Sequence, residues 1–110
     1  MPDVFIVSAR RTPIGSFGGA LATVPAPQLA AQVIQFILAD TGLPASAIDE
    51  VIIGQVLQGG SGQAPARQAM RIAGIPDSAH AMTVNKVCGS GLKTIMLAAD
   101  SIRLGDAAIA

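Results

Sequence analysis

The chain has 110 residues, of which 51% are hydrophobic and only 13% charged, and its seven basic and seven acidic side chains cancel. A neutral chain with three Phe and no Trp or Tyr lacks the basic surface and the aromatic side chains that nucleic acid binding uses. Neutrality also gives it no attraction to an anionic membrane, no stretch is long enough to span one, and a single cysteine excludes an internal disulfide.

The first half of the chain predicts a strand and then a helix. Residues 4–7, VFIV, form a short apolar run rich in β-branched side chains, which is typical of a strand buried on both faces. Apolar residues three and four apart predict a helix over residues 27–40. Gly42 is expected to cap that helix in a left-handed conformation, and Pro44 prevents its continuation.

The second half repeats this alternation. We expect a second buried strand over residues 51–57, a helix over 65–73, a third strand over 81–87 and a helix over 89–104. The last residues, 107–110, begin to resemble a fourth strand. The helix ends are again predicted at glycines, Gly74 and Gly105. Strands that alternate with helices predict an α/β fold, with helices on the faces of a layered sheet.

The single cysteine, Cys88, stands where the third predicted strand gives way to the last helix. A helix N-terminus stabilises negative charge on a thiol, so a cysteine there is a candidate nucleophile. Gly89 and Gly91 allow close approach and leave backbone N–H groups for an oxyanion. A lone cysteine among apolar residues is, however, more commonly buried in the core.

Lys86 is a second candidate in this segment. If the strand persists to Val87, its period of two places Lys86 on the same side as Cys88, where the positive charge would stabilise a thiolate. A solvated lysine is the equal alternative.

The histidine and the arginines of the chain are weaker candidates for a functional site than Cys88. His80 is the only histidine, so no histidine cluster for a metal is possible, and its turn-like surroundings favour the surface over a role as base for Cys88. Four arginines are either substrate anchors or, more commonly for such residues, structural charges: Arg10, Arg11, Arg67 and Arg71.

Four segments, in order, resemble the thiolase family, whose members make or cleave 3-oxoacyl-CoA thioesters. They are residues 7–15 (VSARRTPIG) with 17–21, residues 62–68 (GQAPARQ), residues 85–93 (NKVCGSGLK) and residues 103–107 (RLGDA). Position 64 is Ala where some thiolases have Asn. The resemblance implies that Cys88 carries the acyl group.

The family is several times longer than this chain. The resemblance therefore implies that residues 1–110 are a partial N-terminal domain, the incomplete beginning of the first βαβαβαβ half of a layered α/β fold. A larger protein would also explain why so small a chain has so few charged side chains. A short apolar protein held by a partner is the alternative.

The resemblance implies an acetyl-CoA acetyltransferase that uses CoA thioesters as substrates, with no further cofactor and no metal. The histidine and second cysteine of the family lie beyond residue 110, so this chain alone is expected to be inactive. The complete protein is expected to form a homodimer or homotetramer. Acidic Asp3 stands where a signal peptide would be basic, so the expected location is the cytoplasm.

Three alternatives remain open. The first is a degradative 3-ketoacyl-CoA thiolase of broader chain length. A ketoacyl carrier-protein synthase also uses a cysteine at a helix N-terminus, although residues 85–87 and 11–13 favour thiolase. The third is a non-catalytic packing or dimerisation module.

Overall fold

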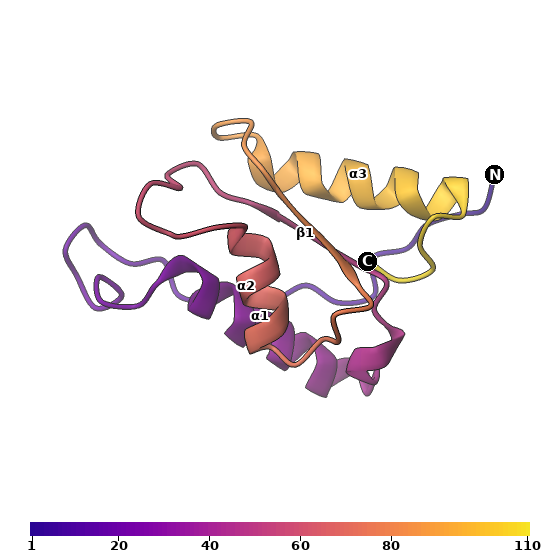
Figure 1. Cartoon of the computed structure of the whole chain (residues 1–110), viewed down its shortest axis with the longest axis horizontal. Helices are drawn as coiled ribbons and strands as arrows, with labels where there is room; N and C mark the ends of the chain where they lie inside the picture. The colour runs from indigo at the N-terminus through magenta and orange to yellow at the C-terminus, as the bar shows by residue number, and fades with distance from the viewer.

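A computed structural model describes all residues, 1–110, as a three-layered arrangement (Figure 1). The elements in chain order are α1 (Ala26–Thr41), the short 3-10 helix η1 (Ala45–Ala47), β1 (Glu50–Gly54), α2 (Pro65–Ile72), β2 (His80–Val84) and α3 (Ser90–Leu104). The α/β class expected from the sequence is confirmed. None of the helices is both long and apolar enough to cross a membrane.

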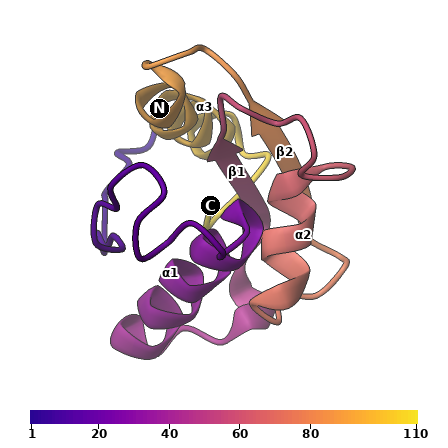
Figure 2. The ribbon, with the colours of Figure 1, turned by 90° about the vertical axis from the view of Figure 1, so that its left-hand side faces the viewer.

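The two strands form a parallel sheet, in which Glu50 lies opposite His80 and Gly54 opposite Val84. A parallel pair needs a crossover between its strands, and α2 provides it. Helix α3 covers one face of the sheet, while α1 and α2 cover the other (Figures 1 and 2). Both strands run the same way, so the loops that follow them emerge at one edge of the sheet.

The core is small and lies between the sheet and the α1–α2 layer. Its buried members are Val51, Met70, Ile75 and Ala79, against which Ile34, Leu38 and Ile53 pack in part. Only 11 of the 110 residues are buried. Most apolar side chains of this hydrophobic chain therefore remain at the surface, including Leu92, Ile95 and Met96 of α3.

The predicted helix ends are confirmed. Gly42, Gly74 and Gly105 all have positive φ, at 69°, 90° and 84°. In this left-handed conformation glycine has no Cβ to clash, and the N–H of the cap can reach back to the last turn. The N–H of Gly42 accordingly donates to the Leu38 carbonyl at 3.0 Å.

The predicted strand over residues 4–7 is wrong. No regular element precedes α1, and no backbone–backbone hydrogen bond involves residues 1–15. Phe5, Ile6 and Val7 are 73–77% exposed. An apolar run becomes a buried strand only when neighbouring strands accept its hydrogen bonds, and neither β1 nor β2 does so here.

The other strands are shorter than predicted. β1 ends at Gly54 instead of residue 57, and β2 at Val84 instead of residue 87. The two ends are register partners, so the ladder stops on both strands together. The fourth predicted strand, over residues 107–110, is also absent.

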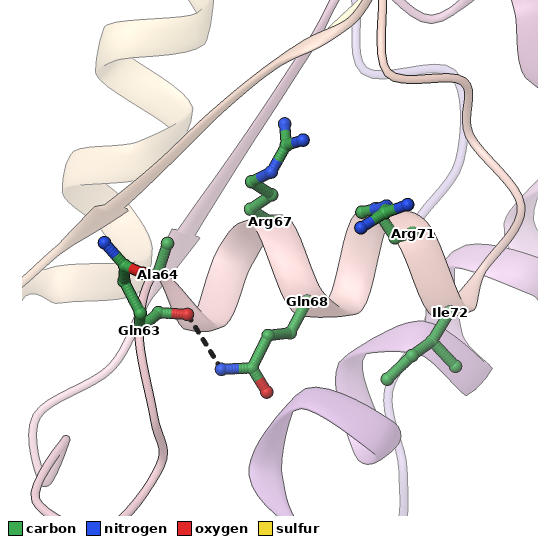
Figure 3. A pocket seen from close by; sticks show the side chains of 6 residues that line it. All are labelled: Gln63, Ala64, Arg67, Gln68, Arg71 and Ile72. Atoms are coloured by element: carbon green, nitrogen blue, oxygen red, sulfur yellow. Dashed lines mark hydrogen bonds between the residues drawn. The ribbon is translucent and has the colours of Figure 1, made fainter.

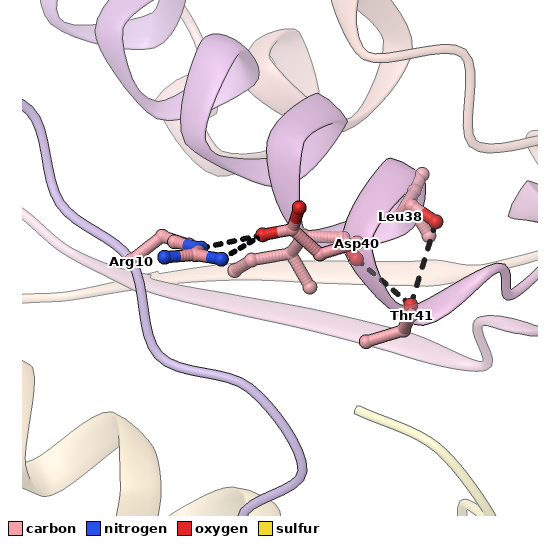
Figure 4. A network of polar contacts seen from close by, with 5 residues as sticks. Arg10, Leu38, Asp40 and Thr41 are labelled. Atoms are coloured by element: carbon pink, nitrogen blue, oxygen red, sulfur yellow. Dashed lines mark hydrogen bonds and ion pairs between the residues drawn. The ribbon is translucent and has the colours of Figure 1, made fainter.

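The N-terminal segment is fixed to α1 at one point. The guanidinium of Arg10 pairs with the carboxylate of Asp40 near the end of the helix (Figure 4). At the next residue, the last of α1, the hydroxyl of Thr41 donates to the Ile37 carbonyl at 2.8 Å. Both partners of the ion pair are substantially exposed, so this contact orients the segment more than it stabilises the fold.

Asp49 joins three segments just before β1. Its backbone N–H donates to the Ile109 carbonyl at 3.0 Å, and its own carbonyl accepts the N–H of His80 at 2.9 Å. Its Oδ2 accepts the N–H groups of Ala108 at 2.7 Å and Ile109 at 3.2 Å. These two backbone donors hold the pKa of the Asp49 carboxyl below its ordinary value.

Gly54 permits a close approach between β1 and α3. A Cβ added at Gly54 would lie 2.7 Å from Cβ of Ser90 and 3.0 Å from the backbone nitrogen of Gly91. The first turn of α3 therefore rests directly on the last residue of β1.

The Asp49 contact predicts an acid-sensitive C-terminal segment. Because folding lowers the pKa, the contribution of this carboxylate to stability is complete above the unfolded value of about 3.9 and is lost as pH falls through the lower folded pKa. The amide proton shifts of Ala108 and Ile109 should titrate together by NMR with a midpoint below 3.9. Asp49→Asn should remove the titration. A midpoint at or above the ordinary value would contradict this contact.

The Gly54 contact predicts that Gly54→Ala destabilises the protein by about 1–3 kcal/mol, since the new methyl group must displace the start of α3. Gly59→Ala is the matched control, because a Cβ there meets nothing within 4 Å and the φ of Gly59 is not positive. Its free energy of unfolding should change by less than about 0.5 kcal/mol. Urea unfolding measures both, and equal effects would refute the close approach.

Candidate active site around Cys88

Cys88 lies in the loop of residues 85–89, which connects β2 to α3 at the edge where both strands end (Figure 1). Its side chain is exposed. The interpretation of Cys88 as a core residue is therefore wrong. Gly89 is the N-cap of α3, so the thiol stands beside the positive end of the helix dipole.

Val87, the residue before the cysteine, has a φ of 51°. A β-branched side chain rarely adopts this left-handed conformation, which costs about 1–3 kcal/mol. The turn keeps the extended backbone from reaching residue 87, where the strand was predicted to end. It also removes the period-two argument that placed Lys86 beside Cys88, and Lys86 forms no ion pair.

Two side chains hold Val87 in this conformation. Oδ1 of Asn85 accepts the Val87 N–H at 2.9 Å, and Oγ of Ser90 donates to the Val87 carbonyl at 2.6 Å. The same Ser90 oxygen accepts the N–H of Lys86 at 2.8 Å. Ser90 is 4% exposed, so water does not compete for these bonds.

Asn85 also joins the Cys88 loop to its neighbour, the loop of residues 55–64. Its Nδ2 donates to the Val56 carbonyl at 3.1 Å. Two glutamine side chains stabilise this second loop. Gln55 donates to Ser61 Oγ at 2.9 Å, and Gln68 of the adjoining helix α2 donates to the Ser61 carbonyl at 2.8 Å. The Cys88 loop is thus bound, through Asn85, to a loop that is itself held by hydrogen bonds at Ser61.

The backbone N–H of Cys88 donates to no other group of the chain. It lies one bond from the Cα that carries the exposed thiol. A free N–H next to a nucleophilic sulfur can bind the oxygen that becomes negative when the sulfur attacks a carbonyl carbon.

The structure separates His80 from Cys88. His80 begins β2 and Cys88 follows its end, so the length of the strand, about 13 Å at 3.3 Å per residue, lies between them. The side chain of His80 is exposed, as the sequence predicts. It is not placed to act as a base for the thiol.

The four arginines show mostly structural contacts. Arg10 pairs with Asp40, while Arg67 and Arg71 reach Asp77 at 3.7 and 3.1 Å. Arg11 forms no ion pair, and it donates to the Thr12 carbonyl at 3.0 Å. These contacts favour the interpretation as structural charges over that as substrate anchors.

An open pocket lies along α2, and Cys88 is not among the residues that line it (Figure 3). Its lining residues are Gln63, Ala64, Arg67, Gln68, Arg71 and Ile72. Gln68 closes one end by donating to the Gln63 carbonyl at 2.8 Å. No group of three or more potential metal ligands occurs in the structure.

The sequence reasoning missed Asn85 and Ser90. A signal for both existed, because Asn and Ser bind backbone groups two or three residues away in turns and at helix starts. Asn85 lies two residues before Val87 and Ser90 three residues after it, which matches this pattern.

Comparisons with known proteins identify relatives of this chain. The "Acetyl-CoA acetyltransferase" of Pseudomonas aeruginosa is 60% identical over 109 residues, which are 99% of this chain and 28% of that protein. The "Probable acetyl-CoA acetyltransferase" of Escherichia coli is 53% identical over the same shares. The "Probable acetyl-CoA acyltransferase" of Staphylococcus aureus is 57% identical over 96% of this chain and 27% of that protein.

A solved structure, the Acat5 thiolase from Ascaris suum in complex with coenzyme A, superposes with a TM-score of 0.84 and 42% identity. The match covers 86% of this chain and 25% of that one. The chain thus spans little more than a quarter of the length of its relatives. The family model described as "Thiolase, N-terminal domain" matches residues 4–110. With this match, with relatives of such identity and with an incomplete α/β fold of the same shape, the chain belongs to the thiolase family.

Proposed function

We propose that this chain supplies the nucleophile of an acetyl-CoA acetyltransferase, and that Cys88 is the residue that carries the acyl group. One observation supports this most: an exposed thiol stands at the start of α3 with its own backbone N–H unpartnered. The names of the relatives support the substrate class, and coenzyme A is bound in the similar thiolase of Ascaris suum.

In the first half-reaction the Cys88 thiolate attacks the carbonyl carbon of acetyl-CoA. A C–S bond forms, the carbonyl oxygen becomes an oxyanion, and the C–S bond to CoA then breaks to leave acetyl-Cys88 and CoA thiolate, which takes up a proton. The N–H of Cys88 donates to the oxyanion. One such donor contributes about 2.7–4 kcal/mol to the transition state in other enzymes.

In the second half-reaction a second acetyl-CoA, deprotonated at its methyl carbon, attacks the acetyl group on Cys88. A carbon–carbon bond forms, the thiolate of Cys88 leaves, and acetoacetyl-CoA is the product. The reverse reaction cleaves acetoacetyl-CoA with free CoA. This sequence needs groups that move protons to and from carbon and sulfur.

This chain does not bring such groups to Cys88. His80 lies at the other end of β2, and there is no second cysteine. We propose that the proton-transfer residues belong to further residues of a longer protein, which assembles as a dimer or tetramer in the cytoplasm. The CoA thioesters then act as substrates with no other cofactor.

A degradative 3-ketoacyl-CoA thiolase of broader chain length is the second candidate, favoured by the acyltransferase name of the Staphylococcus aureus relative. It uses the same nucleophile. Rates of the complete enzyme on short and long 3-oxoacyl-CoA substrates separate the two, since only a broad enzyme cleaves both well.

Replacing the nucleophile tests the proposal. Cys88→Ser in the complete protein should lower acetoacetyl-CoA thiolysis by about 10³-fold or more, because a serine hydroxyl remains protonated at neutral pH. Met96→Leu, an exposed change on the same helix, should keep near wild-type activity. An activity that survives Cys88→Ser would instead favour the packing or dimerisation module.

The chain of 110 residues should be inactive alone. It presents the thiol with neither a histidine beside it nor a second cysteine, so turnover of acetoacetyl-CoA and CoA should stay at the level of a blank without protein. Thiolysis by the isolated chain at a rate near that of the complete protein would show that the proton-transfer groups lie within these residues.

A further inference from the structure

We propose that Ser90, together with Asn85, is a positioning residue that turns the Cys88 N–H toward the substrate oxygen. The inference rests on the proposed function, since it concerns how the acyl group on Cys88 is formed. Neither side chain touches the reacting atoms. Ser90 holds the carbonyl of the peptide bond between Val87 and Cys88, and Asn85 holds the N–H of Val87 in the preceding peptide bond.

The geometry of the Val87–Cys88 peptide bond fixes the direction of the Cys88 N–H. The carbonyl of Val87 and the N–H of Cys88 belong to one planar trans unit, so they point in opposite directions. The Val87 carbonyl is held inward by the Ser90 hydroxyl at 2.6 Å and by the Ser90 N–H at 3.2 Å. The N–H of Cys88 must therefore point outward, away from the first turn of α3.

The conformation of Val87 makes this contact necessary. Its φ of 51° is unfavourable for a β-branched residue, so without support the chain would relax and rotate the peptide. Asn85 holds the other polar group of Val87, the N–H, while its amide is fixed on the Val56 carbonyl. Ser90 itself cannot retreat, because it is buried against Gly54.

Two reactions of the Cys88 thiol distinguish a misplaced Cys88 N–H from a general disturbance of the site. Acetylation by a thioester passes through an oxyanion, which the Cys88 N–H stabilises. Alkylation by iodoacetamide forms a C–S bond at a methylene carbon while iodide leaves, and no oxyanion develops. A mispositioned N–H therefore slows acetylation and leaves alkylation nearly unchanged.

The test uses Ser90→Ala in the complete protein that carries this chain. The single-turnover rate of acetyl-Cys88 formation from acetyl-CoA, followed by mass spectrometry, should fall about 10- to 100-fold, somewhat less than the 10²–10³ for removing an oxyanion donor. The alkylation rate should stay within about threefold. Equal falls in both rates, or an unchanged acetylation rate, would overturn the inference.

Thr94→Ala is the matched control. Oγ1 of Thr94 donates to the Gly91 carbonyl at 2.6 Å. Like the Ser90 hydroxyl, it binds the carbonyl of the third residue before it, but one turn further along α3. It should leave both rates near wild type, and an acetylation loss equal to that of Ser90→Ala would refute a specific role for Ser90.

Asn85→Ala provides a second variant, because Asn85 is exposed and its truncation leaves no buried cavity. If Ser90→Ala does not fold, Asn85→Ala alone must show slower acetylation with retained alkylation, and its failure to do so overturns the inference. A wild-type protein that forms no acetyl-Cys88 refutes the proposed function itself. A wild-type protein that acetylates, with variants that acetylate as fast, refutes only the positioning.

Discussion

The Ser90 hydroxyl, between the Lys86 N–H and the Val87 carbonyl, is the interaction on which the candidate site depends. It connects the end of β2 to the start of α3 and keeps the residue before the cysteine in a conformation that valine avoids. Gly54 makes it possible, since any side chain there would push Ser90 away. A strained turn is thus maintained by buried contacts around it, as is common where a reactive group must be presented.

The parallel sheet divides the molecule into two ends with different roles. At one end Asp49 ties the start of β1 to His80 and to the C-terminal segment, a structural connection. At the other end the loops after both strands meet, and Asn85 links them. In open α/β sheets ligands bind outside the carboxyl ends of the strands, which is the end where the candidate site lies.

Helices and their ends could be predicted from the sequence, because 3.6-residue spacing and terminal glycines act locally. The apolar runs also predicted β1 and β2, but neither the ends of these strands nor the absence of a strand over residues 4–7 could be predicted, since a strand needs partners: residues 4–7 are as apolar as β1 but form no hydrogen bonds with a neighbouring strand. The position of Cys88 was predictable from the junction of strand and helix. The left-handed turn at Val87 was not, because it depends on how β1 and α3 pack.

Ser90 holds the Cys88 N–H outward beside an exposed sulfur, on which the proposed function places the acyl group. Isotope-edited infrared spectroscopy of the acetyl group on Cys88, introduced from ¹³C-carbonyl acetyl-CoA, tests it most directly. A hydrogen bond from the N–H should lower the carbonyl stretching frequency in the folded protein relative to the unfolded one, and Ser90→Ala should reverse much of that shift. An acetyl carbonyl with the same frequency in folded and unfolded protein would contradict the account.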